Sequence, residues 1–287
     1  MKILIAGANS FLGRNLKKYF SQIDAYNVSF LAREDIDFSE IHKLSDYCQQ
    51  IKPDLLIHAA VSLDDFQNNI SMYLSLEQCS AHCGKVIMIG SGAEYSHQRY
   101  KPLMQENYYN PNEPPINNNT YHLSKHIISR LHSASALSNI YNFRVFGLYG
   151  PYEDYTRRLI SNNIFKYLVS GEMSASTNHA FDYLYVDDLI NAILHFANSP
   201  TTPKFNTYNV CSGRSDRFFD ILSEVVISLG GTPSVIKMES TEPTSYIYSG
   251  NCSRFEHEFN YQIQRTNYSK SATLLKSWIS SEILPVN

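Results

Sequence analysis

The sequence predicts an α/β protein built on a doubly wound parallel sheet, and three observations support this. Short, nearly continuous apolar runs alternate with amphipathic segments through the first half of the chain. Gly, Pro and Asn residues punctuate the junctions between these segments. A glycine-rich turn directly follows the first apolar run. Strands that are covered by helices on both faces have this apolar, non-alternating character, so a parallel sheet between two helical layers is expected.

The first half supplies most of the predicted sheet. Residues 2–7 predict a strand, and residues 11–23 predict a helix with its apolar side chains on one face. A second helix is expected over residues 39–51, beginning at Ser39 as N-cap. Gly84 ends a further helix that precedes the fourth strand. The remaining strands are expected over residues 27–33, 53–60, 85–92 and 140–150.

The second half is less regular. Helices are expected over residues 185–199 and 218–230, and a short strand over residues 207–213. Residues 108–120, which are rich in Pro and Asn, predict a long loop, and long loops beside a rigid sheet often carry function. No internal repeat stands out.

Composition excludes several classes of protein. Hydrophobic residues make up 43% and charged residues 18% of the 287 residues, which is typical of a globular protein. The formal net charge of -3 argues against nucleic acid as the main partner. No apolar run is long enough to span a membrane, and the N-terminus lacks the pattern of a signal peptide. We therefore expect a cytoplasmic protein with no membrane partner.

The five cysteines are odd in number and scattered, which favours reduced thiols over a disulfide framework. Cys79 and Cys83 lie one helical turn apart, with His82 beside them. No second ligand pair follows at zinc spacing, so small buried thiols are favoured over a metal site. We predict no bound metal.

The turn Gly7–Gly13 (GANSFLG) joins the first strand to the first helix. The backbone N–H groups and the dipole at such a helix N-terminus attract an anion such as a phosphate group. Gly7 permits the turn, and Gly13 permits close packing of helix against strand. Ser10 stands where a glycine would let a pyrophosphate approach, so we expect its small side chain to turn aside, with the hydroxyl available to a phosphate oxygen. This predicts a Rossmann-type dinucleotide site.

The end of the second strand indicates which dinucleotide. An acidic residue there usually meets a free ribose 2′-hydroxyl, whereas an arginine suits the 2′-phosphate of NADP. Arg33 comes first in this chain, and Glu34 and Asp35 follow it. The pattern favours NADP, with NAD as the alternative. If these residues have no function, they form a solvated cluster of charges.

A tyrosine and a lysine form the candidate catalytic pair. Tyr121 and Lys125 lie one turn apart on a predicted helix and share a face. A nearby ammonium group stabilises a phenolate, so the pair can exchange a proton with a carbonyl or an alcohol. Ser91 lies just beyond the end of a predicted strand, where parallel sheets bind ligands, and its hydroxyl can bind a reacting carbonyl oxygen.

Taken together, these motifs resemble the extended short-chain dehydrogenases/reductases of the NAD-dependent epimerase/dehydratase family, in the branch that modifies nucleotide sugars. The resemblance covers nearly the whole chain. It rests on these stretches, in chain order: GANSFLG (7–13), LLIHAAV (55–61), SGAEY (91–95), YHLSK (121–125), FRVFGLYGP (143–151), FDYLYVDDL (181–189) and NCSRFEHEFNY (251–261).

The resemblance implies a role for each matched residue. Tyr121 is the acid/base, Lys125 stabilises its phenolate and binds the nicotinamide ribose, and Ser91 polarises the substrate carbonyl. The implied domains are a dinucleotide-binding domain over residues 1–165, rejoined by residues 183–212, and a mainly substrate-binding domain over residues 166–287. The expected cofactor contacts are Gly7, Asn9, Ser10, Phe11, Leu12, Gly13, Arg33, His58, Ala59, Ala60, Tyr121 and Lys125. The expected substrate contacts are Glu94, Tyr95, Gly147, Arg157, Arg158 and Arg214.

Two positions depart from the family pattern. Phe181 stands where relatives usually place an arginine that contacts the substrate diphosphate, and Gly147 stands where they often place an asparagine. Another cation should then meet the diphosphate. Arg157 and Arg158 are the first candidates, and the neighbouring pair Arg214 and Arg217 is the second. Asp187 and Asp188 are interpreted as caps of the helix over residues 185–199.

The residues directly after Ser91 narrow the choice of reaction. Dehydratases of this kind have an Asp-Glu pair there, whereas this chain has Gly92 and Ala93. With Arg33, this favours an NADP-dependent 4-ketoreductase of a nucleotide-activated deoxysugar. The alternative is an NAD-dependent nucleotide-sugar 4-epimerase, and a non-catalytic, cofactor-sensing protein is a remote third. By resemblance, a homodimer through the Tyr–Lys helix is expected.

Overall fold

The computed structural model describes residues 1–115 and 119–284 of the chain. Its centre is a six-stranded sheet in which every strand pair is parallel. The strand order is β10-β5-β4-β3-β1-β2. The strands are β1 (Lys2–Ala6), β2 (Asn27–Leu31), β3 (Leu55–His58), β4 (Lys85–Ser91), β5 (Ile140–Val145) and β10 (Thr207–Asn209). The predicted α/β, Rossmann-type fold is confirmed.

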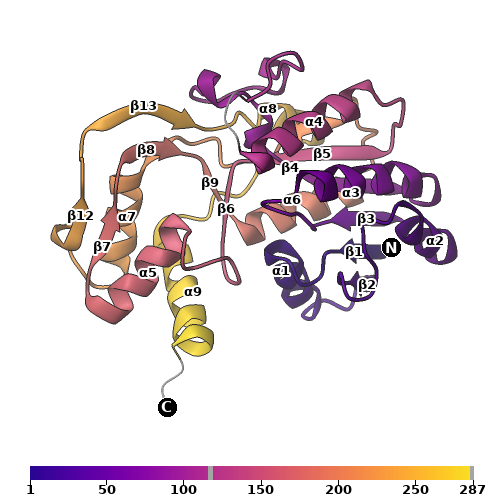
Figure 1. The fold of residues 1–287 in the computed structure, drawn as a ribbon. Coiled ribbons are helices and arrows are strands. Elements are labelled where there is room, and N and C mark those ends of the chain that lie inside the picture. Colours follow the sequence, from indigo (N-terminus) through magenta and orange to yellow (C-terminus); the bar gives the residue numbers. More distant parts are fainter. Residues whose placement is uncertain (116–118, 285–287) are drawn as a thin grey trace.

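Helices cover both faces of this sheet (Figure 1). Within β1, Ile3 and Ile5 face one buried apolar cluster, and Leu4 and Ala6 face the other. The first cluster is closed by α1 (Phe11–Phe20), α6 (Val186–Asn198) and α8 (Ser253–Phe259). The second is closed by α2 (Ile41–Ile51), α3 (Phe66–Cys79) and α4 (Thr120–Ala134). The continuous apolar runs of the sequence are therefore strands buried on both faces.

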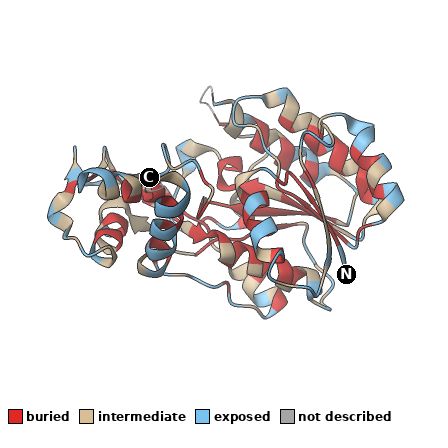
Figure 2. Cartoon of the chain, turned by 90° about the horizontal axis from the view of Figure 1, so that it is seen from below, coloured by how far each residue is buried: buried red, intermediate tan, exposed pale blue. Residues whose placement is uncertain are grey.

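A smaller lobe lies beside the carboxyl ends of these strands, at the other end of the molecule in Figure 2. Three helices pack together there: α5 (Leu159–Ser170), α7 (Phe218–Ser228) and α9 (Tyr268–Trp278). Its strands are short: β6 (Gly147–Tyr149), β7 (Met173–Ala175), β8 (Asn178–Phe181), β9 (Tyr183–Tyr185), β11 (Asp216–Arg217), β12 (Ile236–Met238) and β13 (Pro243–Tyr248). Because β10 pairs with β5, the chain returns to the main sheet before it completes this lobe.

Several predicted boundaries were wrong. The strand expected over residues 140–150 divides at Phe146, because Gly147 N–H donates to Asp182 O and β6 pairs with β9 instead of continuing β5. The N-cap of α2 is Glu40 and not Ser39, whose hydroxyl bonds to Asp37. The loop expected over residues 108–120 is shorter at both ends, because Tyr108 ends a 3₁₀ turn (Glu106–Tyr108) and Thr120 begins α4; its residues 116–118 lie outside the described ranges.

Asp187 and Asp188 do not cap α6. The N-cap residue is Tyr185, and no side chain caps that helix. The two carboxylate oxygens of Asp188 instead accept hydrogen bonds from the backbone N–H and the hydroxyl of Thr266, both at 2.8 Å. Asp188 therefore holds α6 in contact with the segment that precedes α9.

Candidate active site

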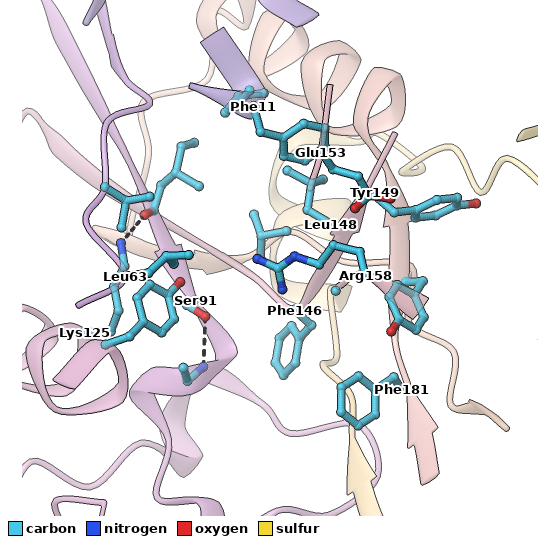
Figure 3. A pocket seen from close by; sticks show the side chains of 18 of the residues that line it. Phe11, Leu63, Ser91, Lys125, Phe146, Leu148, Tyr149, Glu153, Arg158 and Phe181 are labelled. Carbon is cyan, nitrogen blue, oxygen red and sulfur yellow. Dashed lines mark hydrogen bonds between the residues drawn. The ribbon is translucent and has the colours of Figure 1, made fainter. Parts of the chain in front are cut away.

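A cleft of about 710 Å³ lies between the carboxyl ends of the central strands and the smaller lobe (Figure 3). Strand order reverses between β1 and β3, and open parallel sheets bind ligands at such a switch point. The cleft is lined on the sheet side by Ser10, Phe11, Leu12, Ala59, Ala60, Ser91, Tyr121 and Lys125. It is lined on the other side by Gly147, Leu148, Glu153, Arg157, Arg158, Phe181, Tyr183, Tyr246 and Tyr248. Its volume suits an organic ligand of considerable size.

The glycine turn forms a cradle at the N-terminus of α1. Gly7 has a φ of +94°, and a Cβ there would lie 2.5 Å from the backbone nitrogen of Ala60. A Cβ on Gly13 would lie 2.0 Å from Gly7 O, so only glycine allows α1 to sit this close to β1. Ser10 is the N-cap of α1, and its Oγ accepts a hydrogen bond from Gly13 N at 3.0 Å. The side chain turns toward the helix, as expected, and the cradle fits a phosphate group.

The edge of this cradle carries both a cation and a carboxylate. Arg33 is exposed and, among the described residues, forms no ion pair. It does not line the cleft. Asn9, on the glycine turn, donates a hydrogen bond of 3.1 Å to the Glu34 carboxylate. Both residue types that discriminate between NADP and NAD therefore lie at the end of β2.

Ser91, Tyr121 and Lys125 all line the cleft, as the motifs predicted. Ser91 ends β4, and its Oγ accepts a hydrogen bond from Ala93 N at 3.1 Å. Tyr121 lies in the first turn of α4. Lys125 Nζ donates to Ile89 O at 2.8 Å and lies 5.7 Å from the centre of the Tyr121 ring. The buried lysine is thus fixed to the strand that carries Ser91, beneath the tyrosine.

Glu94 and Tyr95, two expected substrate contacts, do not line the cleft. Glu94 is buried behind Ser91, where it forms an ion pair with Arg144 and accepts a hydrogen bond from Ser91 N at 3.0 Å. Tyr95 is also buried, and its hydroxyl donates to Asn209 Oδ1 at 3.1 Å. The 3₁₀ turn Gly92–Glu94 directs both side chains into the core. Glu94 therefore holds Ser91 from the side away from the cleft.

His58, an expected cofactor contact, lines a small cavity behind the cleft together with Lys125 and Glu94. Burial lowers the pKa of its imidazole to about 3, and the nearby Lys125 charge acts in the same direction. The ring is therefore neutral at physiological pH. Among the described residues, its Nε2 has no hydrogen-bond partner.

The arginines that were expected to bind the substrate diphosphate lie in two different places. Arg157 and Arg158 line the cleft at the start of α5, and the Arg158 side chain points into it (Figure 3). Arg157 is exposed and pairs with Asp154 at 3.4 Å. Arg214 lies outside the cleft, where it pairs with Asp216 at 3.3 Å and covers the Tyr268 ring. Arg217 donates to two backbone carbonyl groups and is structural.

Glu153 lines the cleft but did not figure among the expected site residues. Its side chain is buried, and neither carboxylate oxygen has a hydrogen-bond partner among the described residues. Burial raises its pKa to about 8. The acidic pair Glu153-Asp154, which follows the Gly150-Pro151 turn after one intervening residue, is the signal that sequence reasoning could have used.

Aromatic rings around Phe181 form another part of the cleft wall. Phe181 lies 6.0 Å from Tyr183, 5.9 Å from Tyr246 and 5.2 Å from Tyr248, measured between ring centres. In each pair, 181 with 183 and 246 with 248, the two rings are separated by one residue, a spacing that places side chains on one face of an extended chain. This alternation was visible in the sequence. Gly147 lies beside this wall, and a Cβ there would lie 2.6 Å from Asp182 O, which explains the glycine.

Within the described parts of the chain, none of the helices has the length and hydropathy of a membrane span. Solved structures of similar fold come from several enzymes. A GDP-L-fucose synthetase from Naegleria fowleri bound to NADP matches with a TM-score of 0.81 and 16% identity, over 99% of this chain and 95% of that one.

Two further structures match with comparable scores. A UDP-glucose 4-epimerase from Thermotoga maritima, solved with UDP-glucose, matches with a TM-score of 0.79 and 15% identity, over 99% of this chain and 100% of that one. A dTDP-glucose 4,6-dehydratase from Bacillus anthracis, in complex with NAD, matches with a TM-score of 0.76 and 16% identity, over 98% and 97%.

The model of the NAD dependent epimerase/dehydratase family matches residues 3–211, which include the glycine turn, Ser91 and the Tyr121–Lys125 pair. The family implies a nicotinamide dinucleotide cofactor, and the glycine cradle fits its phosphates. The chain is an enzyme of the NAD dependent epimerase/dehydratase family.

Proposed function

We propose that this enzyme reduces a 4-keto nucleotide-activated deoxysugar with NADPH. The observation that supports this most is that Ser91, Tyr121 and Lys125 line the same cleft as the residues of the glycine turn. A hydride donor, a carbonyl and a proton donor can therefore meet at one place.

The chain's residues have distinct tasks in this reaction. A nicotinamide dinucleotide held by the glycine turn would supply the hydride. Ser91 Oγ accepts a hydrogen bond from Ala93 N, so its O–H can donate to the carbonyl oxygen of the substrate. Tyr121 donates the proton that converts the developing alkoxide into an alcohol. Lys125, held by Ile89 O, places a positive charge where the phenolate is left.

The surroundings of Ser91 argue against dehydration. A Cβ on Gly92 would lie 2.5 Å from the Phe146 ring and 2.7 Å from the Tyr248 hydroxyl, so an acidic side chain has no room there. Glu94 is held by Arg144 in the core. No carboxylate in these positions can expel water from the substrate.

The substrate diphosphate is assigned to Arg158. Its guanidinium group points into the cleft, and none of the described acidic residues forms an ion pair with it. A guanidinium fork can bind two phosphate oxygens at once. The aromatic wall around Phe181 can then stack on the sugar or the base. The GDP-L-fucose synthetase and the UDP-glucose 4-epimerase of similar fold act on nucleotide sugars by name, which is consistent with this substrate class.

One observation favours the alternative, an NAD-dependent 4-epimerase. Glu34 is hydrogen-bonded to Asn9 on the glycine turn, where a carboxylate could accept a hydrogen bond from a ribose 2′-hydroxyl. Arg33, at the same edge, favours the 2′-phosphate of NADP instead.

The test is a binding titration with NADPH and NADH, followed by turnover assays on 4-keto nucleotide sugars with different nucleosides. We expect tighter binding of NADPH. Arg33→Ala should weaken NADPH by about 10- to 100-fold, as expected for loss of a charge-assisted contact, and leave NADH almost unchanged. Glu34→Gln is the matched control and should not weaken NADPH. Tighter NADH binding that depends on Glu34 would support the epimerase.

A homodimer stays a prediction. Leu74 on α3 and Leu123 and Leu131 on α4 are exposed, and these helices cover one face of the sheet. A measurement of mass in solution tests this expectation.

A further inference from the structure

Three cysteines converge at the end of the sheet opposite the cleft. Cys48 comes from α2, Cys79 is the last residue of α3, and Cys83 follows one 3₁₀ turn later. Their Sγ atoms all lie within 4.8 Å of one another. The sequence showed only the pair in α3 and its turn, because Cys48 is brought to it by the packing of α2 against α3.

We propose that Cys48, Cys79 and Cys83 form a binding site for a thiophilic metal ion such as Zn²⁺. Sulfur atoms that share a tetrahedral zinc ion are separated by about 3.8 Å, given Zn–S bonds of about 2.3 Å. The distances between the three sulfur atoms therefore need to shorten by about an ångström at most. On binding, each ligating S–H bond gives its proton to the solvent and its sulfur forms a bond to the metal.

The helix ends around the cluster favour a cation. Cys48 lies in the last turn of α2 and Cys79 ends α3, so the negative ends of two helix dipoles meet there. Neither last turn contains a basic residue, and Lys52, which follows α2, is exposed. A positive ion bound between the sulfurs is favoured.

The third ligand is held in position by the surrounding turn. Asn139 Nδ2 donates to the backbone oxygens of Ser80, Cys83 and Gly84, at 2.9, 3.1 and 3.3 Å. Cys48 and Cys79 are buried, whereas Cys83 and its neighbour His82 are half-buried. This gives the ion a route in, and it makes His82 or a water molecule the candidate for the fourth position. Because the cluster lies far from the cleft, the ion would join α2 to α3 and take no part in catalysis.

The test uses the full chain without a histidine tag, reduced and freed of metal. We expect one equivalent of Co²⁺ to give the absorption of tetrahedral thiolate coordination, and Zn²⁺ to displace it. Cys48→Ser, Cys79→Ser and Cys83→Ser should each weaken binding at least about tenfold, because each removes a sulfur ligand. Cys252→Ser is the matched control, because it alters a buried cysteine elsewhere, and it should bind like the wild type.

A second measurement covers variants that fail to fold. In the wild-type chain, one equivalent of Zn²⁺ should protect Cys83 from alkylation, as mapped by peptide mass. The proposal is overturned if the reduced wild type binds no Co²⁺ or Zn²⁺, or if binding is equal in Cys83→Ser. It is also overturned if Zn²⁺ leaves the alkylation of Cys83 unchanged.

Discussion

The two walls of the cleft are built differently. On the sheet side, Ser91 and Lys125 are buried and hydrogen-bonded to the backbone of neighbouring residues, and long strands and a helix fix their positions. On the opposite side, the short strands β8 and β13 present aromatic rings, and the segment before α5 supplies Arg158 and the buried Glu153, whose carboxylate oxygens have no hydrogen-bond partner among the described residues. The first wall is organised by the fold itself. The second wall offers polar groups that are available to a ligand. This is expected of the part of a site that recognises a specific substrate.

The largest effect on stability is expected for the ion pair that is buried behind the sheet-side wall. Glu94→Gln removes the carboxylate that pairs with buried Arg144, and leaves that charge uncompensated. We expect the free energy of unfolding to fall by about 3–5 kcal/mol, measured by urea denaturation. Glu113→Gln is the matched control: it breaks the exposed pair with Arg99 and should leave the free energy of unfolding almost unchanged. Equal losses in both variants would contradict the idea that the buried Glu94–Arg144 pair stabilises the sheet-side wall of the cleft.

A residue of the second wall, Glu153, should make the free energy of unfolding depend on pH. Burial raises the pKa of Glu153 to about 8 in the folded chain, from an ordinary value near 4.5. The folded state therefore holds a proton that the unfolded state releases, so this residue's contribution to stability is full at about pH 4 and is lost as pH rises toward about 8. Glu153→Gln should lose this dependence and gain up to a few kcal/mol relative to the wild type by pH 8.

The neighbouring carboxylate provides the control for that measurement. Asp154 is exposed, and hydrogen bonds from Thr156 lower its pKa. Asp154→Asn should therefore show no change in relative stability between about pH 5 and pH 8. A Glu153→Gln variant whose stability runs parallel to that of the wild type across this range would show that the carboxyl group is solvated.

A smaller effect, on ligand binding, is expected to differ between Arg157 and Arg158 of the second wall. Arg158→Ala should weaken binding of a nucleoside diphosphate by about 10- to 100-fold at low salt, because a charge-assisted contact is lost. Both arginines are exposed, but Arg157 already pairs with Asp154, so Arg157→Ala should weaken binding less than about fivefold. Isothermal titration calorimetry measures both. The reverse order would place the diphosphate at the mouth of the cleft.

The same contrast explains how far the site could be predicted from the sequence. Ser91, Tyr121 and Lys125 are set by local pattern, since a strand end and one helical turn fix how they lie. The second wall depends on contacts between distant segments: β13 pairs with β8 through a register shift, and β6 leaves the main sheet to pair with β9. Arg158 and Arg214 therefore look alike in the sequence, and only the fold places one of them in the cleft. Glu94 was misplaced for a related reason, because its partner Arg144 lies on another strand.

Turnover by Tyr121→Phe, assayed with NADPH on 4-keto nucleotide sugars, is the decisive measurement for the proposed reaction. We expect kcat to fall roughly 100- to 10,000-fold, as for loss of a general acid, with NADPH affinity almost unchanged. Tyr246→Phe, which removes a hydroxyl from another cleft-lining tyrosine, should keep most of the activity. Turnover by Tyr121→Phe equal to that of the wild type on every such substrate would contradict the assignment of Tyr121 as the proton donor.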